Sequence, residues 1–121
     1  MTWTQAKNRI TKRIKVGTDL STANSSHRTV LSIRNDITSN RYGYNAEDGF
    51  QVQIGSGSSI SIPFSMLKSC YGAIASKPGY GGDFFRQHYP KQAADHPCHV
   101  HVVGQVFVKA GLATQHGELY R

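Results

Sequence analysis

The sequence predicts an α+β fold, with an antiparallel sheet of three to four strands, helices packed on one side of it, and a helical C-terminal half. Apolar and polar residues alternate through residues 50–54 and again through 60–62, on either side of a Gly- and Ser-rich turn. After Pro63, apolar residues recur every three or four positions, which is the spacing of one helix face. A hairpin and a helix therefore share an apolar side. We expect this side to be buried, through Phe50, Val52, Ile54, Ile60, Ile62, Leu67, Tyr71 and Ile74.

The 121 residues suffice for a single domain, residues 1–121, with one hydrophobic core. No apolar run approaches the ~20 residues that cross a bilayer, and the N-terminus has no signal-peptide-like apolar block. We therefore expect a cytoplasmic protein without a membrane partner. In that compartment Cys70 and Cys98 would be free thiols.

The N-terminal segment has helical spacing. A basic, amphipathic helix is predicted over residues 3–15, capped by Thr2 or Thr4 and ended by Gly17. Its apolar stripe consists of Trp3, Ala6, Ile10 and Ile14. Residues 17–27 are rich in Ser, Thr, Asn and Gly, which predicts a loop.

The sheet is expected over about residues 28–62. A first strand is predicted at residues 28–33, followed by a turn at 35–40. A short return strand at 41–44 and a second turn at 45–49 would then lead into the central hairpin.

The C-terminal half is expected to form helices at about residues 63–76, 83–88 and 97–110, followed by a short strand or tail. The last helix is the ambiguous one. Pro97 at its start and Gly111 at its end favour a helix, whereas its many valines are equally natural in a strand. We favour the helix.

The order of helix, short helix, helix and extended tail in residues 63–121 resembles the helix-turn-helix core of winged-helix DNA-binding domains. The resemblance is one of element order alone. It implies that the third helix would read base edges.

The histidines carry a second resemblance. The run His99-Val-His101-Val-Val-Gly104 is similar to the end of the signature of histidine-triad nucleotide hydrolases, in which Pro97 would take the place of the first histidine. That resemblance implies that His99 is the nucleophile. His88, His96 and Cys98 lie close by, but no CxxC-type or HxxxH-type spacing is present, so we expect no zinc.

The charge is unevenly distributed. The net charge is +7, and residues 1–41 hold eight basic and two acidic side chains, whereas residues 42–121 hold six and five. Such a field attracts polyanions, of which nucleic acid is the commonest. Two nearby tyrosines would either stack on bases or fill space in the sheet. We therefore expect a nucleic-acid-binding domain without catalysis or cofactor, with DNA a better candidate than RNA, that binds through Lys7, Arg9, Lys12, Arg13, Lys15, Arg28, Arg34, Arg41, Tyr42 and Tyr44.

Two alternatives stay open. One is a protein–protein interaction module or accessory subunit whose basic surface meets an acidic partner. The other is a histidine-based hydrolase or metal site. An enzyme is the less favoured class, because no acids stand at catalytic spacing and the glycines of residues 55–57 lack the Lys-Ser/Thr of a phosphate-binding loop.

Overall fold

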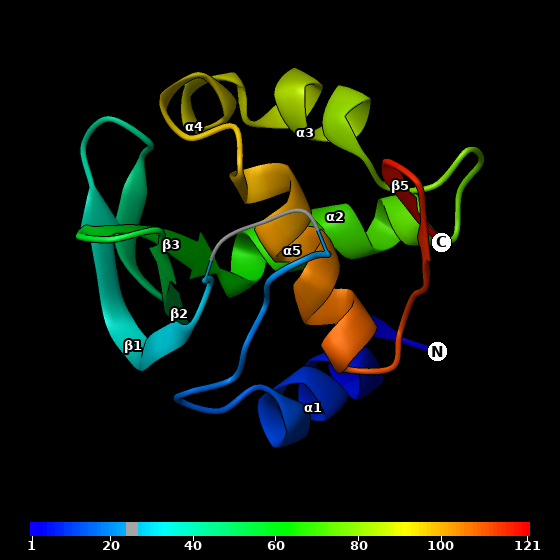
Figure 1. Ribbon diagram of the computed structural model, residues 1–121, viewed down its shortest axis with the longest axis horizontal. Coiled ribbons are helices and arrows are strands. Elements are labelled where there is room, and N and C mark those ends of the chain that lie inside the picture. Colours follow the sequence, from blue (N-terminus) through cyan, green and yellow to red (C-terminus); the bar gives the residue numbers. More distant parts are fainter. Residues whose placement is uncertain (24–26) are drawn as a thin grey trace.

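A computed structural model, which describes residues 1–23 and 27–121, has an α+β architecture (Figure 1). The helices are α1 (Trp3–Arg13), α2 (Phe64–Ile74), α3 (Gly82–His88), α4 (Pro90–Asp95) and α5 (His99–Lys109). The strands β1 (Val30–Ser39), β2 (Tyr44–Ile54) and β3 (Ser58–Pro63) form an antiparallel sheet in that order. A small second sheet pairs β4 (Gln115–His116) with β5 (Leu119–Tyr120).

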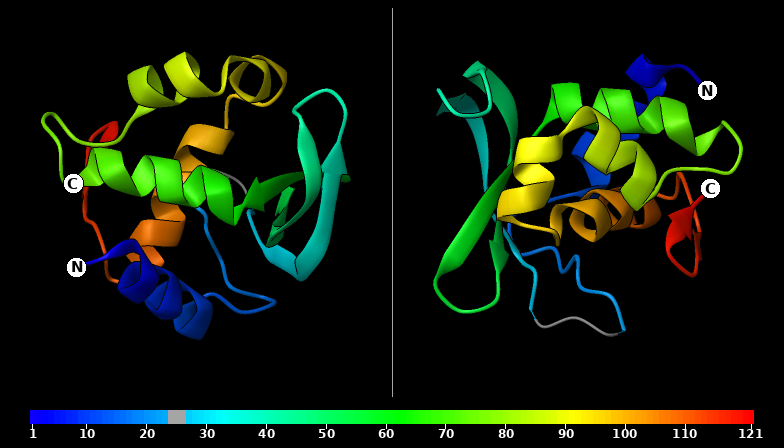
Figure 2. Two further views of the ribbon diagram at one scale, coloured as in Figure 1. Left: turned by 180° about the vertical axis from the view of Figure 1, so that it is seen from behind. Right: turned by 90° about the horizontal axis from the view of Figure 1, so that it is seen from above.

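The helices lie on one side of the three-stranded sheet, as expected (Figure 2). Helix α5 crosses the middle of this helical layer and contacts α1, α2 and α4. It is the most deeply buried element, since eight of its eleven residues are buried. The chain is therefore organised around α5 as much as around the hairpin.

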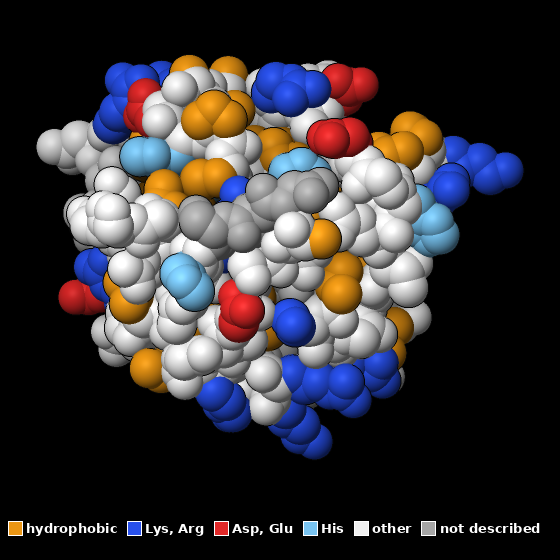
Figure 3. Space-filling view, in the orientation of Figure 1, with side chains coloured by type: hydrophobic (Ala, Val, Ile, Leu, Met, Phe, Trp, Pro, Cys, Tyr) orange, Lys and Arg blue, Asp and Glu red, His pale blue; other side chains and the backbone are white. Residues whose placement is uncertain are grey.

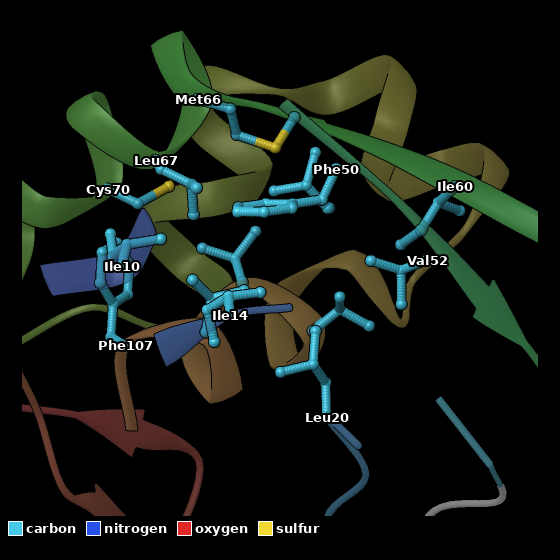
Figure 4. Packing of buried hydrophobic residues seen from close by; sticks show 14 of the residues in the cluster. Ile10, Ile14, Leu20, Phe50, Val52, Ile60, Met66, Leu67, Cys70 and Phe107 are labelled. Carbon is cyan, nitrogen blue, oxygen red and sulfur yellow. The ribbon is translucent and has the colours of Figure 1, made fainter. Parts of the chain in front are cut away.

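The core joins the hairpin to α2 and α1 (Figure 4). Phe50 lies beside Met66, and Val52 lies beside its cross-strand partner Ile60. Of the eight residues expected in the core, five are 3 % exposed or less, namely Phe50, Val52, Ile60, Ile62 and Leu67. The other three are only partly buried at the margin of the core, so the prediction overstates their burial: Ile54, Tyr71 and Ile74.

Helix α1 forms as the sequence predicts, although it ends two residues earlier. Thr2 is the N-cap, and a capping box with Gln5 satisfies the first free backbone donors. Ala6, Ile10 and Ile14 are fully buried, so the apolar stripe fixes the helix to the core. Ile14 has an extended backbone, which stops the helix before residue 15. Of the loop predicted over residues 17–27, residues 24–26 lie outside the described part.

The first hairpin differs from the prediction. Residues 35–39 and 45–49 are strand, not turns, and the turn lies at residues 40–43, where a return strand had been expected. Strand β1 is at the edge of the sheet and has three register irregularities, so its burial does not alternate cleanly. Gly49 sits inside β2 because a Cβ there would lie 2.7 Å from the Cα of Pro63.

The C-terminal half is helical, as expected, with one additional helix. The additional helix is α4, which begins at Pro90, where the missing N–H of proline is no loss. The helical assignment for residues 97–110 is confirmed, with α5 starting at His99. Cys98 occupies its N-cap position. Among the described residues, no helix has the length and apolar character needed to cross a membrane.

Candidate nucleic-acid interface

Five basic side chains project from α1 and from the residue pair that follows it. Lys12, Arg13 and Lys15 are exposed. The half-buried pair is held in place: Lys7 Nζ lies 4.8 Å from the ring centroid of Phe64, and Arg9 Nη1 donates to the carbonyl of Gly111 at 3.5 Å. Gly111 directly follows the C-cap of α5, and cations are favourable near a helix C-terminus.

These five charges lack a carboxylate partner within residues 1–23 and 27–121, whereas three arginines elsewhere have one. Arg34 contacts Asp36 at 3.0 Å, Arg86 contacts Asp83 at 2.9 Å, and Arg41 contacts Asp95 at 2.6 Å. Lysines and arginines accordingly gather at the lower edge of the molecule, where α1 lies (Figure 3). The positive charge of α1 is therefore largely uncompensated.

The candidate residues of the sheet and its first turn lie apart from α1, and their side chains are hydrogen-bonded to other groups of the protein. Arg34 donates to Gln51 Oε1 at 2.9 Å in addition to its ion pair. Arg41 makes two hydrogen bonds to the Asp95 carboxylate, at 2.6 and 2.8 Å. Hydrogen bonds from Arg41 and Tyr42 hold the pKa of Asp95 at about 2, so the pair stays charged. The ten predicted residues are thus distributed over more than one place on the protein.

The two tyrosines form part of the interior at the first turn. Tyr44 is 8 % exposed, its hydroxyl accepts a hydrogen bond from Gln92 at 2.9 Å, and burial raises its pKa to about 12. Tyr42 donates to Asp95, and its ring lies 5.6 Å from that of Tyr44. The packing alternative describes both residues better than stacking on bases does.

The histidines of α5 face different surroundings. His99 is 2 % exposed, its ring is stacked on Phe85, and burial lowers its pKa to about 4. His101 Nδ1 is instead 2.9 Å from the hydroxyl of Tyr120. His99 and His101 lie on a helix, where residues two apart point in different directions, whereas the histidine-triad signature needs its alternating residues on one face. Within the described chain, no three His, Cys, Asp or Glu side chains are grouped so that they could hold a metal ion.

Helix α5 also cannot play the part that the winged-helix resemblance implies. A helix that reads base edges must present side chains to a groove, and most of α5 is buried instead. Its sequence already carried the signal, because apolar residues occur all around the helix, which is typical of a core helix.

Arg28, which the sequence predicts to contact nucleic acid, is only partly exposed. Its Nη1 atom is buried without a hydrogen-bond partner in the described residues. The residue lines a pocket of about 520 Å³ with His101, Gln115 and Glu118. No local sequence pattern indicates this pocket, because its walls come from segments far apart in the chain.

Comparisons with known protein families, with curated proteins and with solved structures find no match to this chain.

Proposed function

We propose that this protein binds nucleic acid, duplex DNA in the first place, through phosphate contacts from the outer face of α1. The observation that carries the proposal is that the cations on α1 and just after it have no carboxylate partner in the described part of the chain, whereas three arginines elsewhere have one. Unpaired cations keep their full attraction for phosphate, because no ion pair must be broken first.

The way in which α1 packs against the core suits a helix that binds nucleic acid. Its buried stripe fixes the helix, so the basic side chains extend from a rigid element. Eleven residues make a helix about 16 Å long. Duplex DNA carries about one charge per 1.7 Å of axis, so about four to six phosphate contacts are within reach if half of the phosphates face the helix.

The engagement of the tyrosines favours a duplex over a single strand. Proteins that bind single strands combine a basic groove with aromatic side chains on which bases stack. Tyr42 and Tyr44 contact each other, Asp95 and Gln92, so they offer no free stacking platform. Phosphate contacts then supply the affinity, and such contacts are sequence-independent.

The test is a salt titration of binding to double-stranded DNA, single-stranded DNA and RNA, followed by fluorescence anisotropy. With four to six contacts, the plot of log K against log salt for duplex DNA should have a slope of about −3.5 to −5.5. The triple variant Lys12→Ala, Arg13→Ala, Lys15→Ala should weaken binding to every sequence alike and flatten the slope by up to about three.

A control variant separates this surface from overall charge. Replacing Lys68, Lys77 and Lys91 by Ala removes the same net charge from exposed side chains on other elements. We expect it to bind nearly as the wild type does. Equal losses in both triple variants would contradict an interface on α1. If the wild type binds no nucleic acid even at low salt, an acidic protein partner becomes the better reading of the same surface.

A further inference from the structure

We propose that the cleft between α2 and α3 binds a small uncharged molecule that carries an aromatic ring. The cleft has a volume of about 890 Å³, and volumes of about 300–1,000 Å³ are typical of sites for small molecules. It lies over the C-terminal half of α2 and beside β5 (Figure 1). None of the described residues that line it belongs to α1 or to the loop after α1, so the site does not depend on the function proposed for that helix.

The interior of the cleft is largely apolar. Ala73 of α2 and Val100 of α5 line it and are buried. Phe84 of α3 and Leu119 of β5 also line it, and these larger side chains are only partly buried. Apolar surface is therefore left in contact with water at the cleft, and a ligand that covers this surface gains free energy through the hydrophobic effect.

Phe84 gives the cleft an aromatic wall in a fixed orientation. Its ring is stacked on His88, with 4.0 Å between the ring centroids, and Tyr80 contacts it in a T-shaped arrangement at 6.2 Å. A ring held in this way favours a second ring in offset-stacked or edge-to-face contact. The ligand that fits is therefore aromatic rather than aliphatic.

The charges around the cleft balance one another. Two basic side chains, Lys77 and Arg86, and two acidic ones, Asp83 and Glu118, line it. Arg86 Nη2 lies 2.9 Å from Asp83 Oδ1, so these two charges already compensate each other. A charged ligand would lose part of its hydration without meeting an excess of opposite charge. An uncharged ligand avoids this cost.

One end of the cleft offers hydrogen bonds to a polar group on the ring. Nδ1 of His101 is 2.9 Å from the hydroxyl of Tyr120, which leaves Nε2 to face the carboxylate of Glu118 at 3.4 Å. The Glu118 side chain is 92 % exposed, so this long contact can give way to a ligand. An N–H or O–H group on the ligand can then donate to the carboxylate, which fixes the orientation of the ring.

Gly72 keeps the cleft open on the side of α2. A nearby glycine has a packing reason, because a Cβ at Gly81 would lie 2.7 Å from Cδ2 of Leu119. At Gly72 the backbone is helical, and a Cβ would meet nothing within 4 Å. Glycine is unfavourable inside a helix, since it loses the most conformational freedom there. An open binding cleft gives a reason for Gly72 that neither packing nor backbone conformation supplies.

The test uses probes that share one ring and differ in charge. Indole is uncharged, indole-3-acetate is an anion and tryptamine is a cation, and cyclohexanol serves as the uncharged probe without an aromatic ring. Calorimetry and thermal shift measure binding at constant ionic strength. We expect saturable binding of indole, and binding at least about tenfold weaker for each of the other probes. Failure of indole to bind, or equal binding of any other probe, would overturn the proposal.

A cleft-filling variant tests the location of the site. Gly72→Leu places an apolar side chain in open space, so the variant should fold and lose indole binding. Ala75→Leu is the matched control, because it enlarges an exposed residue at the end of the same helix that is not among those lining the cleft. It should bind indole as the wild type does. Phe84→Leu keeps an apolar wall without the ring and should bind indole several-fold more weakly.

Indole binding that is unchanged in Gly72→Leu would refute the site. Should that variant fail to fold, amide chemical shifts of the wild type decide. Shifts on indole addition should fall at Gly72, Gly81 and Leu119, and shifts confined to α1 would contradict the proposal. Gly72→Leu should leave the salt dependence of duplex DNA binding unchanged, and the α1 triple variant should bind indole normally. Failure of the cleft and failure of the nucleic-acid interface are therefore distinguishable.

Discussion

Gly104 lies in the middle of α5, where the ring of Tyr120 rests against the helix backbone. A Cβ at Gly104 would lie 2.6 Å from Cδ2 of that ring and closer still to Cε2 and Cζ. The ring would have to withdraw by roughly 1 Å or more to regain ordinary carbon–carbon separation. Tyr120 is fully buried, and its backbone pairs with Tyr80 in both directions, at 2.8 and 2.9 Å. The ring therefore has little freedom to move.

Gly104→Ala tests this packing through the sign of its effect. In a free helix interior, replacing Gly by Ala stabilises by roughly 0.5–1 kcal/mol. Overpacking a tight contact typically costs about 1–3 kcal/mol. We expect the clash to dominate, so that the variant loses about 1–2 kcal/mol of unfolding free energy.

Gly72 provides the matched control. It also lies inside a helix, but it is exposed, and a Cβ there would meet nothing within 4 Å. Gly72→Ala should therefore stabilise the protein by up to about 1 kcal/mol. Urea denaturation with an unchanged m-value measures both effects. A Gly104→Ala variant as stable as the wild type, or more stable, would show that Tyr120 is not packed on α5 as described.

Three further predictions concern stability and metal content. Leu67→Ala removes a fully buried side chain and should cost about 2–5 kcal/mol in urea denaturation. Burial lowers the pKa of His99 from 6.5 to about 4, so between these values the unfolded chain binds a proton that the folded chain does not. This contribution to stability is present above the unfolded pKa and is lost as pH falls, by about 2 kcal/mol between pH 7 and pH 5. His99→Asn should flatten that slope, and a variant that keeps the full slope would contradict the assignment. Protein purified without added metal should contain far less than one equivalent of zinc by elemental analysis, because its Cys and His residues lack a ligand knuckle.

The spacing of apolar residues predicted those elements that bury the same face along their whole length. The hairpin of β2 and β3, α1 and α2 each present one continuous apolar face, so alternation or helical spacing sufficed. Strand β1 is an edge strand with bulges, and its polar residues 35 and 36 imitate a turn. Helix α4 was missed because Pro90 both ends one helix and begins the next.

The candidate surface was harder to predict, because counting charges along a chain does not show which of them are paired. Arg41 and Asp95 are 54 positions apart, and only the fold brings them together. Arg34 and Arg41 count toward the excess of the first 41 residues, yet each is matched by a carboxylate.

The basic residues that have no carboxylate partner among the described residues differ in burial. The cations of α1 are mostly exposed and have no carboxylate partner among the described residues, which suits weak, salt-dependent contacts to a long polyanion. Arg28 differs, because its Nη1 atom is buried and has no hydrogen-bond partner among the described residues. Net charge alone would assign all of these residues to one interface. Their different burial instead separates Arg28 from the cations of α1, to which the proposed nucleic-acid contacts are assigned.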